Sequence, residues 1–411
     1  MDFRQLFEFK QMMGKRYKLL SDLVCPLCHS SMVHEGISLS CPPCGKTYPV
    51  FEGEVPVFIE TDANMFSSRL FGLEPESLPN EDQIQKLPPE QHAQVGLLLW
   101  SLAWDKITSH TVAIGEYETD PDVERAFQSA VDSIDYIFGG SLNYDAIYLK
   151  AVQSYHFAAH PPVSPSLEFG GNWGWWTNYV YPGLRIEYSS EFIGNYFLDG
   201  FKGSLHTRRH EVFDQLLVSY ASKLPLPDSS LKTVLSMHIL DHVPSTELED
   251  LFREGARVLA KGGRFIADTY TPSGIHRSLA DVLFLDKLGF SSKDYSGWRN
   301  SYKNATNATA YVQKMSASLD GYANGQNLLT LEEWEEIGER FGLRLIKKQP
   351  YNLAWIHGLL KDIYYKGFFP PKILDRHFLG ELKKCVYLEL KGTKRIEFSD
   401  ACNVFMIFEK I

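Results

Sequence analysis

A glycine-rich turn between two short strand-like stretches constrains this chain more than any other feature. Residues 166–169 (Ser-Leu-Glu-Phe) have the pattern of a buried strand, and the segment 170–174 that follows contains three glycines. Glycines let the backbone turn sharply and pass close to a ligand, because they carry no Cβ. A second short strand is predicted over 184–187, ending on the carboxylate of Glu187. A glycine turn after one strand and an acidic residue after the next is a pattern that holds a nucleoside.

Four motifs then follow one another in a fixed order. The stretch 168–174 (Glu-Phe-Gly-Gly-Asn-Trp-Gly) is followed by 224–228 (Leu-Pro-Leu-Pro-Asp), 238–242 (His-Ile-Leu-Asp-His) and 257–264 (Arg-Val-Leu-Ala-Lys-Gly-Gly-Arg). This order resembles the class I S-adenosylmethionine (SAM)-dependent methyltransferases of the type 11 group. The resemblance covers 164–411 and implies an α/β fold with a Rossmann-like, seven-stranded SAM-binding sheet.

The resemblance also implies which residues contact SAM. They are Glu168, Gly170, Gly171, Asn172, Trp173, Gly174, Glu187, Tyr220 and Ala221. Three positions depart from the family pattern. Asn172 replaces the central glycine of the loop, Tyr220 follows the third strand where many relatives have the aspartate that binds adenine, and Lys232 stands where an acidic residue is usual. Tyr220 is expected to stack on the adenine or donate its hydroxyl instead.

Two Cys-x-x-Cys turns predict a zinc site near the start of the chain. Cys25 and Cys28 form one turn and Cys41 and Cys44 the other, with twelve residues between the pairs. Two such turns complete a tetrahedral thiolate site, and four protein ligands leave no open position, so the zinc is expected to be structural. Residues 20–60 resemble the small zinc ribbon that precedes some methyltransferases and that also occurs alone as an activator of tRNA methyltransferases.

The motifs divide the chain into three predicted units. Residues 1–60 comprise an N-terminal helix and the zinc ribbon, and 61–163 form a helical cover. Residues 164–411 form the SAM-binding domain, with insertions at 271–327 and 351–395 that act as lids over the site. An aromatic, loop-rich insertion at the carboxyl end of the strands is where substrate is expected to bind.

The predicted cover contains one clear helix start. Asp120 is a helix N-cap with proline at the first helical position, before a helix that runs to about Phe138. Helices ahead of the nucleotide domain cover the cofactor and substrate in the resembled family. Two histidines and three tyrosines are therefore candidates to line the site, namely His156, His160, Tyr144, Tyr148 and Tyr155. Plain packing of a helical subdomain is the alternative.

The composition limits the classes of partner that this chain is expected to bind. The net charge of −10 and pI near 5.7 argue against a nucleic-acid partner, because phosphate binding requires a basic surface. The sequence contains no run of about 18 apolar residues, so no membrane span is expected. The start of the chain lacks the pattern of a secretory signal, and closely paired cysteines suit metal binding in a reducing compartment, so a cytoplasmic location is expected.

The expected activity is methyl transfer from SAM to a small molecule or biosynthetic intermediate. This is an in-line displacement, which needs alignment, exclusion of water, and a base only if the nucleophile carries a proton. His238, just past the fourth strand, is the candidate base, and a hydrogen-bonded core histidine is the alternative. Three other functions stay open. They are attack on another carbon of SAM (aminocarboxypropyl transfer or cyclisation), a non-catalytic domain that binds a partner protein, and RNA methylation.

Overall fold

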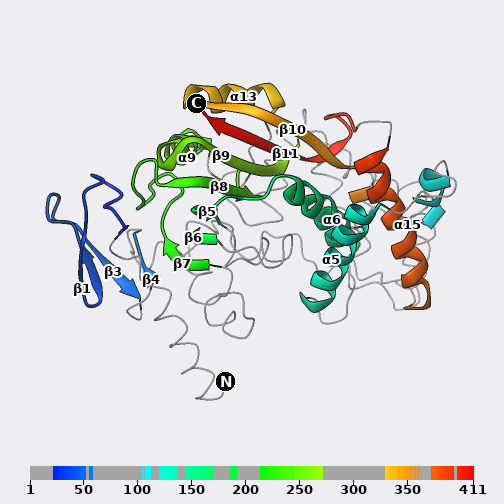
Figure 1. The fold of residues 1–411 in the computed structure, drawn as a ribbon, viewed down its shortest axis with the longest axis horizontal. Helices are drawn as coiled ribbons and strands as arrows, with labels where there is room; N and C mark the ends of the chain where they lie inside the picture. Colours follow the sequence, from blue (N-terminus) through cyan, green and yellow to red (C-terminus); the bar gives the residue numbers. More distant parts are fainter. Residues whose placement is uncertain are drawn as a thin grey trace, which may run out of the picture.

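The structure, a computed structural model, has a central sheet with helices on both faces and a small four-stranded sheet at one end (Figure 1). The part of the chain that it describes comprises residues 22–51, 55–58, 104–105, 107–112, 120–137, 144–170, 186–191, 213–241, 243, 245–271, 329–353, 356–357, 360, 372–392 and 396–411. Among these residues no helix is long and apolar enough to cross a membrane.

Seven strands form the central sheet, in the order β10-β11-β9-β8-β5-β6-β7. Their bounds are β5 (Ser166–Phe169), β6 (Ile186–Glu191), β7 (Phe213–Val218), β8 (Leu231–Met237), β9 (Leu259–Tyr270), β10 (Leu343–Leu353) and β11 (Ala401–Lys410). Strands β7, β6, β5, β8 and β9 are parallel, whereas β11 runs antiparallel to both β9 and β10. This arrangement confirms the α/β class that the sequence predicts.

Alternate side chains of β11 contact different helices, which shows how the layers are built. Phe408 packs edge-on against Phe252 of α9 (Ser245–Val258), and Phe252 stacks on Trp334 of α13 (Leu331–Arg340). Phe405 points to the other face of the sheet, where it stacks on His156 of α6 (Tyr144–Ala159). Successive strand residues face opposite sides. The sheet therefore lies between α9 with α13 and α6.

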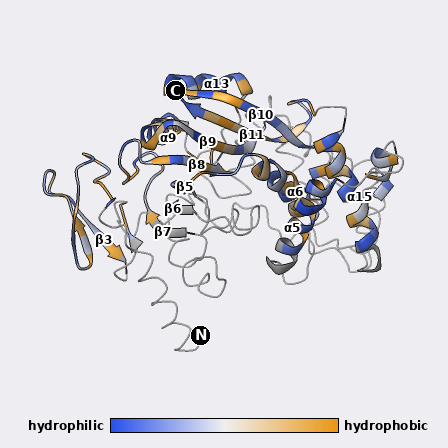
Figure 2. Cartoon of the chain, viewed as in Figure 1, coloured by the Kyte–Doolittle hydropathy of each residue, from blue (hydrophilic) through white to orange (hydrophobic). Residues whose placement is uncertain are grey.

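Two helices begin at side-chain caps, one of which the sequence predicts. The Asp120 carboxylate accepts hydrogen bonds from the backbone N–H groups of Asp122 and Val123 at the start of α5 (Pro121–Ile137). Thr330 and Glu333 form a reciprocal capping box at the start of α13. Hydrophilic and hydrophobic residues alternate along α13 in Figure 2, as expected for a helix with one face on the protein. The helix start predicted at Asp120 is confirmed.

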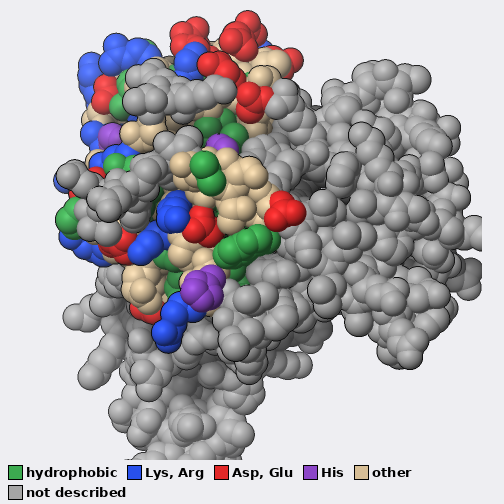
Figure 3. All heavy atoms as spheres, turned by 90° about the vertical axis from the view of Figure 1, so that its right-hand side faces the viewer, with side chains coloured by type: hydrophobic (Ala, Val, Ile, Leu, Met, Phe, Trp, Pro, Cys, Tyr) green, Lys and Arg blue, Asp and Glu red, His purple; other side chains and the backbone are tan. Residues whose placement is uncertain are grey.

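Helices α5 and α6 pack with α15 (Lys372–Lys391) beside the sheet. Two ion pairs join α15 to α5. Lys383 of α15 lies 2.8 Å from Glu124 of α5, and Lys391 of α15 lies 2.8 Å from Asp120, the N-cap of α5. Figure 3 views the molecule from the α15 side. Positive and negative side chains are interspersed over the described part of this face, and no field of one sign dominates it.

The small sheet lies against the edge of the large one. It consists of β1 (Val33–Glu35), β2 (Ser38–Ser40), β3 (Thr47–Phe51) and β4 (Val55–Pro56), and β4 contacts edge strand β7 (Figure 1). The backbone N–H of Val24 donates to the carbonyl of Pro225, 3.1 Å away. Leu39, Tyr48 and Phe58 belong to the same buried hydrophobic cluster as Leu217 of β7. Their shared core joins the two sheets.

One strand boundary differs from the prediction. The strand expected to end at Glu187 begins at Ile186 and continues to Glu191, so the expected end is wrong. Glu191 is the last residue of β6. Its neighbour Ser190 pairs with Phe169, the last residue of β5. The N-terminal helix predicted within 1–20 and nearly all of the 271–327 insertion lie outside the described residues.

Candidate functional site

The strand order reverses between β5 and β8. From β5 the chain continues through β6 and β7 on one side, and it then returns to β8 on the other side. In open α/β sheets ligands bind outside the carboxyl ends of the strands at such a point. The residues that follow Phe169 and Met237 are therefore the centre of the candidate site.

Gly170 brings the ends of these two strands together. Its φ is +54°, a left-handed conformation that side chains with a Cβ adopt at a cost. A Cβ at this position would lie 2.5 Å from Cδ1 and 3.0 Å from Cγ1 of Ile239, which follows β8. Both the backbone angle and the close approach explain why glycine stands at this position.

A buried acid and a buried lysine meet at the end of β5. Glu168 and Lys150 of α6 are both fully buried. Burial holds the pKa of Lys150 well below its usual value, and the nearby Glu168 carboxylate opposes that shift. Helix α6 thus brings an amine toward the acidic residue that precedes the glycine turn.

His238 leaves β8 in a strained conformation with its ring among polar groups. Its φ is +55°, and its backbone N–H donates to the carbonyl of Asp268, 2.9 Å away. The ring Nε2 lies 3.0 Å from Nε2 of Gln153 on α6 and 3.5 Å from Oδ1 of Asp268 on β9. A left-handed non-glycine residue is uncommon and typical of functional sites.

Asp268 and Tyr351 continue this polar group into the core. The Tyr351 hydroxyl donates to Oδ2 of Asp268 and accepts from Nε2 of Gln153, 2.8 Å away. Burial raises the pKa of Asp268 well above its usual value, and the charge of Asp241 raises it further, although hydrogen bonds from Tyr351 and Gln153 oppose the shift. Burial also raises the pKa of Tyr351. Both groups are therefore biased toward their neutral, proton-bearing forms.

A second buried polar group links α6 to α15 and the end of β10. Tyr148 donates to the carboxylate of Glu389, which also accepts from the backbone N–H of Asn352, 2.5 Å away. Asn352 has a φ of +61°. Burial raises the pKa of Glu389 to about 7 against the effect of these hydrogen bonds. This carboxylate ties α15 to a strained position of the sheet.

The structure places the predicted SAM contacts as follows. Glu168 and Gly170 lie at the carboxyl end of β5. Glu187 is the second residue of β6, and Tyr220 and Ala221 follow β7, where the Tyr220 carbonyl accepts from the N–H of Lys223. The remaining four, which lie outside the described residues, are Gly171, Asn172, Trp173 and Gly174.

The candidates from the predicted cover contact other described parts of the protein. His156 is buried against Phe405, and burial lowers its pKa to about 3, so it stays neutral at physiological pH. His160 lies at the end of α6, with its Nε2 2.7 Å from Nζ of Lys347. Tyr148 bonds Glu389, as described above. Packing, the alternative for these side chains, matches these positions.

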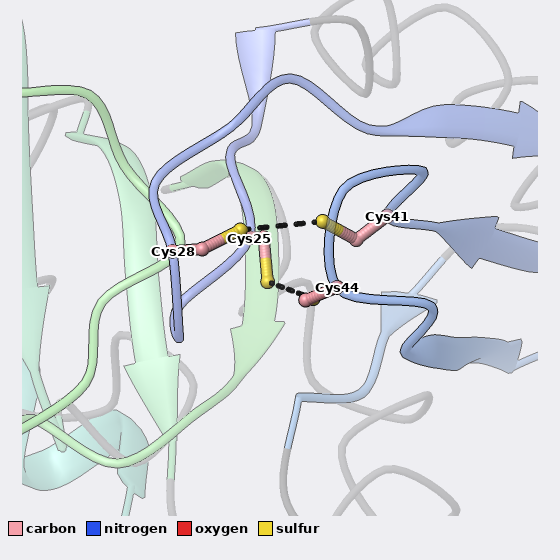
Figure 4. A group of neighbouring side chains, drawn as sticks. All are labelled: Cys25, Cys28, Cys41 and Cys44. Carbon is pink, nitrogen blue, oxygen red and sulfur yellow. Dashed lines mark hydrogen bonds between the residues drawn. The ribbon is translucent and has the colours of Figure 1, made fainter.

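The four cysteine thiols converge in the small sheet (Figure 4). All four Sγ atoms lie within 4.8 Å of one another, with 3.5 Å between Cys25 and Cys44 and 3.4 Å between Cys28 and Cys41. A tetrahedron with metal–sulfur bonds of about 2.3 Å has sulfur atoms about 3.8 Å apart. The thiols are therefore grouped closely enough to bind one tetrahedral metal ion.

The two cysteine turns have the same backbone construction. The N–H of His29 donates to the carbonyl of Cys25, and the N–H of Gly45 donates to that of Cys41, both at 2.8 Å. His29 has φ +55° and Gly45 has φ +68°, so each turn closes with a left-handed residue directly after its second cysteine. This repeated geometry presents both thiols of each pair from one tight turn.

Sequence reasoning missed Gln153, Tyr351 and Asp268. Gln153 is 85 residues from His238 and 198 from Tyr351, so only the fold brings them together. Asp268 did carry a signal, because a charged residue directly follows three buried apolar residues near the end of β9. A buried carboxylate in a strand requires a polar partner.

A comparison with protein families matches the segment that runs from the end of β5 into β9. Residues 170–267 match the model of a family described as the methyltransferase domain. No curated protein matches the sequence significantly.

Solved structures resemble the chain weakly. A Galdieria sulphuraria protein provisionally assigned as a sarcosine dimethylglycine methyltransferase is 12% identical, with a TM-score of 0.38, over 68% of this chain and 98% of that one. A Thermotoga maritima SAM-dependent methyltransferase is 15% identical (TM-score 0.36; 70% and 100% covered). The geranyl diphosphate C-methyltransferase of Streptomyces coelicolor is 13% identical (TM-score 0.37; 65% and 78% covered). Likenesses this weak carry no argument about function.

Proposed function

We propose that this chain is a SAM-dependent methyltransferase that acts on a small molecule or biosynthetic intermediate. One observation carries the proposal. The methyltransferase-domain match starts at Gly170, the left-handed residue where the strand order reverses, and ends at Ala267, beside Asp268. The matched segment therefore borders the place where an open α/β sheet binds its ligand.

The residues at this edge suit SAM. Gly170 keeps the backbone at the end of β5 free of a side chain, and Glu168 supplies the acidic residue before it. We assign the methionine end of SAM to Glu168, Gly170, Gly171, Asn172, Trp173 and Gly174, the ribose hydroxyls to Glu187, and the adenine to Tyr220 and Ala221. When bound, SAM supplies a methyl group on a positively charged sulfur.

The chain's own residues have three tasks in this reaction. They align the acceptor, exclude water and control one proton near the acceptor. His238, Gln153 and Lys150 are the polar side chains available for these tasks at the edge where β5 and β8 end. The insertions at 271–327 and 351–395 are assigned as lids, and the acidic composition favours a small acceptor over RNA.

The cysteine cluster is assigned a structural zinc ion. The spacing of the four thiols fits a tetrahedral site, and no fifth ligand is needed. Because Cys25 and Cys41 belong to the hydrophobic cluster that also contains Leu217, zinc would stabilise the contact with the edge of the large sheet. This assignment makes residues 20–60 a zinc ribbon.

Isothermal calorimetry with SAM tests the cofactor assignment. Losing a charge-assisted hydrogen bond costs about 1.5–3 kcal/mol, so Glu187→Ala should weaken SAM binding about ten- to a hundredfold. Glu191→Ala is the matched control, since it removes the same group further along β6. A loss confined to Glu191→Ala would move the ribose contact to the end of the strand.

Mass spectrometry of the reaction products tests the chemistry. The protein is incubated with SAM and either a metabolite fraction or a fraction of RNA and protein, and S-adenosylhomocysteine is expected with the metabolites. Methylthioadenosine as the product would instead show attack on another carbon of SAM. No measurable SAM binding would exclude both enzyme assignments and favour a protein-binding role.

A further inference from the structure

The hydrogen atoms around His238 can be ordered from the deepest group outward. The Tyr351 hydroxyl has one hydrogen, and it donates that hydrogen to Oδ2 of Asp268. The oxygen of Tyr351 must therefore accept the hydrogen bond from Gln153, whose amide nitrogen lies 2.8 Å away. This order turns the amide nitrogen of Gln153, and not its oxygen, toward the group.

The same amide nitrogen lies 3.0 Å from Nε2 of His238. An amide nitrogen donates hydrogen bonds and does not accept them, so Nε2 of His238 is the acceptor in this contact. A nitrogen that accepts a hydrogen bond carries no proton, so in a neutral ring the proton lies on Nδ1. A doubly protonated ring would place Nε2–H against the N–H of Gln153, which disfavours the charged form.

Asp268 supports the same order. Its Oδ1 lies 3.5 Å from Nε2 of His238. An ionised carboxylate there would attract a proton onto Nε2. Burial instead favours the protonated carboxyl, whose O–H is a second donor toward Nε2.

We propose that Gln153, held by Tyr351 and Asp268, is a positioning residue that fixes His238 as the neutral tautomer with its proton on Nδ1. His238 then serves as a hydrogen-bond donor and not as the base expected from the sequence. The tautomer follows from the contact with the amide nitrogen of Gln153 together with the burial of Asp268. Its consequence rests on the proposed function: the acceptor molecule presents an oxygen to His238, as a carbonyl or carboxylate does, and its nucleophile loses no proton to this residue.

Nitrogen NMR on the full-length protein labelled with ¹⁵N-histidine reads the tautomer directly. The sequence has 13 histidines, and the signal of His238 is assigned by its loss in His238→Asn. Asparagine suits the left-handed backbone and carries an N–H, so this variant should fold. At neutral pH we expect a protonated Nδ1 and a bare Nε2. A proton on Nε2, alone or in an imidazolium, would overturn the proposal.

Gln153→Glu tests the role of Gln153. It replaces the donor with an acceptor of the same shape, so the proton of His238 should move to Nε2. Gln128→Glu makes the same change on exposed α5, where Gln128 bonds Asp132, and should leave His238 unchanged. If Gln153→Glu does not fold, Gln153→Leu removes the donor without a charge and should lower the population of the Nδ1–H form. An unchanged tautomer in the folded variant would contradict the positioning role.

Methyl transfer to an acceptor found in the metabolite fraction tests the consequence. His238→Asn keeps a donor, and its kcat/KM should stay within about tenfold of wild type. His238→Asp presents only acceptors when ionised and should lose more. If His238 is instead a base, His238→Asn should lose about 10²–10⁴-fold. The NMR result stands whether or not methyl transfer occurs, so failure of the proposed function is distinguishable from failure of this inference.

Discussion

Asp145 and His357 form an ion pair inside the protein, with Oδ1 and Nδ1 2.6 Å apart. The pair joins the first turn of α6 to the segment that follows β10. Burial alone would lower the pKa of His357, but the charge of Asp145 outweighs it and raises the pKa to about 10. The imidazole is therefore positively charged at neutral pH, and the pair connects the helix to the sheet.

The stability that this pair contributes should fall at alkaline pH. The pKa of His357 is higher in the folded protein (about 10) than in the unfolded chain (about 6.5). The contribution is therefore complete below pH 6.5 and is lost as the pH rises through 10. Asp145→Asn should cost about 3–5 kcal/mol at pH 6 and less at pH 10. Urea unfolding at both pH values measures this, and His377→Asn, exposed on α15, should show neither effect.

Glu389 should make stability fall with rising pH as well, but over a lower pH range. Its pKa is about 7 in the folded protein, against an ordinary value of 4.5, so the folded state holds an extra proton between these values. The contribution of Glu389 is present below pH 4.5 and is lost as the pH rises to 7. Relative to Glu389→Gln, the wild type should lose stability over this interval. Equal pH dependence of the two proteins would contradict the shift, and exposed Glu336→Gln is the control.

Metal analysis should find one zinc ion per chain. Cys41→Ser removes one of four thiolates and should lose the metal. Because the small sheet shares a hydrophobic cluster with β7, the melting temperature of the whole chain should also fall. Cys385→Ser is the control, since Cys385 is buried outside the cluster of four thiols and its substitution should leave zinc bound. Metal-free wild-type protein, or a disulfide between these cysteines, would refute the site.

Gly170→Ala should weaken SAM binding. The left-handed backbone costs a residue with a Cβ about 1–2 kcal/mol, and the new Cβ would press on Ile239. Ile239→Val removes the closest atom, Cδ1. The double variant should therefore regain part of the affinity for SAM, but not the free energy lost to the left-handed backbone. Gly380→Ala in α15 meets open space and should be neutral or stabilising. Calorimetry and thermal unfolding separate these contributions when they are applied to Gly170→Ala, Ile239→Val, the double variant and Gly380→Ala.

Local features of the fold were predictable because neighbouring residues determine them. Asp120 and Thr330 cap helices through bonds to groups two or three residues away, and the structure has both caps. The last strand is buried, as its apolar run indicates. The end of β6 was not predictable, because a strand continues for as long as its neighbours pair with it, and Ser190 and Glu191 pair with Phe169 and Val218.

By itself the sequence determined the order of the strands along the chain, the glycine turn at Gly170 and the two cysteine turns, since each depends on short-range geometry. Only the tertiary structure decided which side chains surround His238. Gln153 comes from α6, which precedes the first strand of the large sheet, and Tyr351 comes from β10, near the end of the chain. No spacing along the sequence encodes their approach. Burial at that meeting point then shifts the pKa of Asp268, because desolvation depends on everything packed around a group and not on its neighbours in the chain.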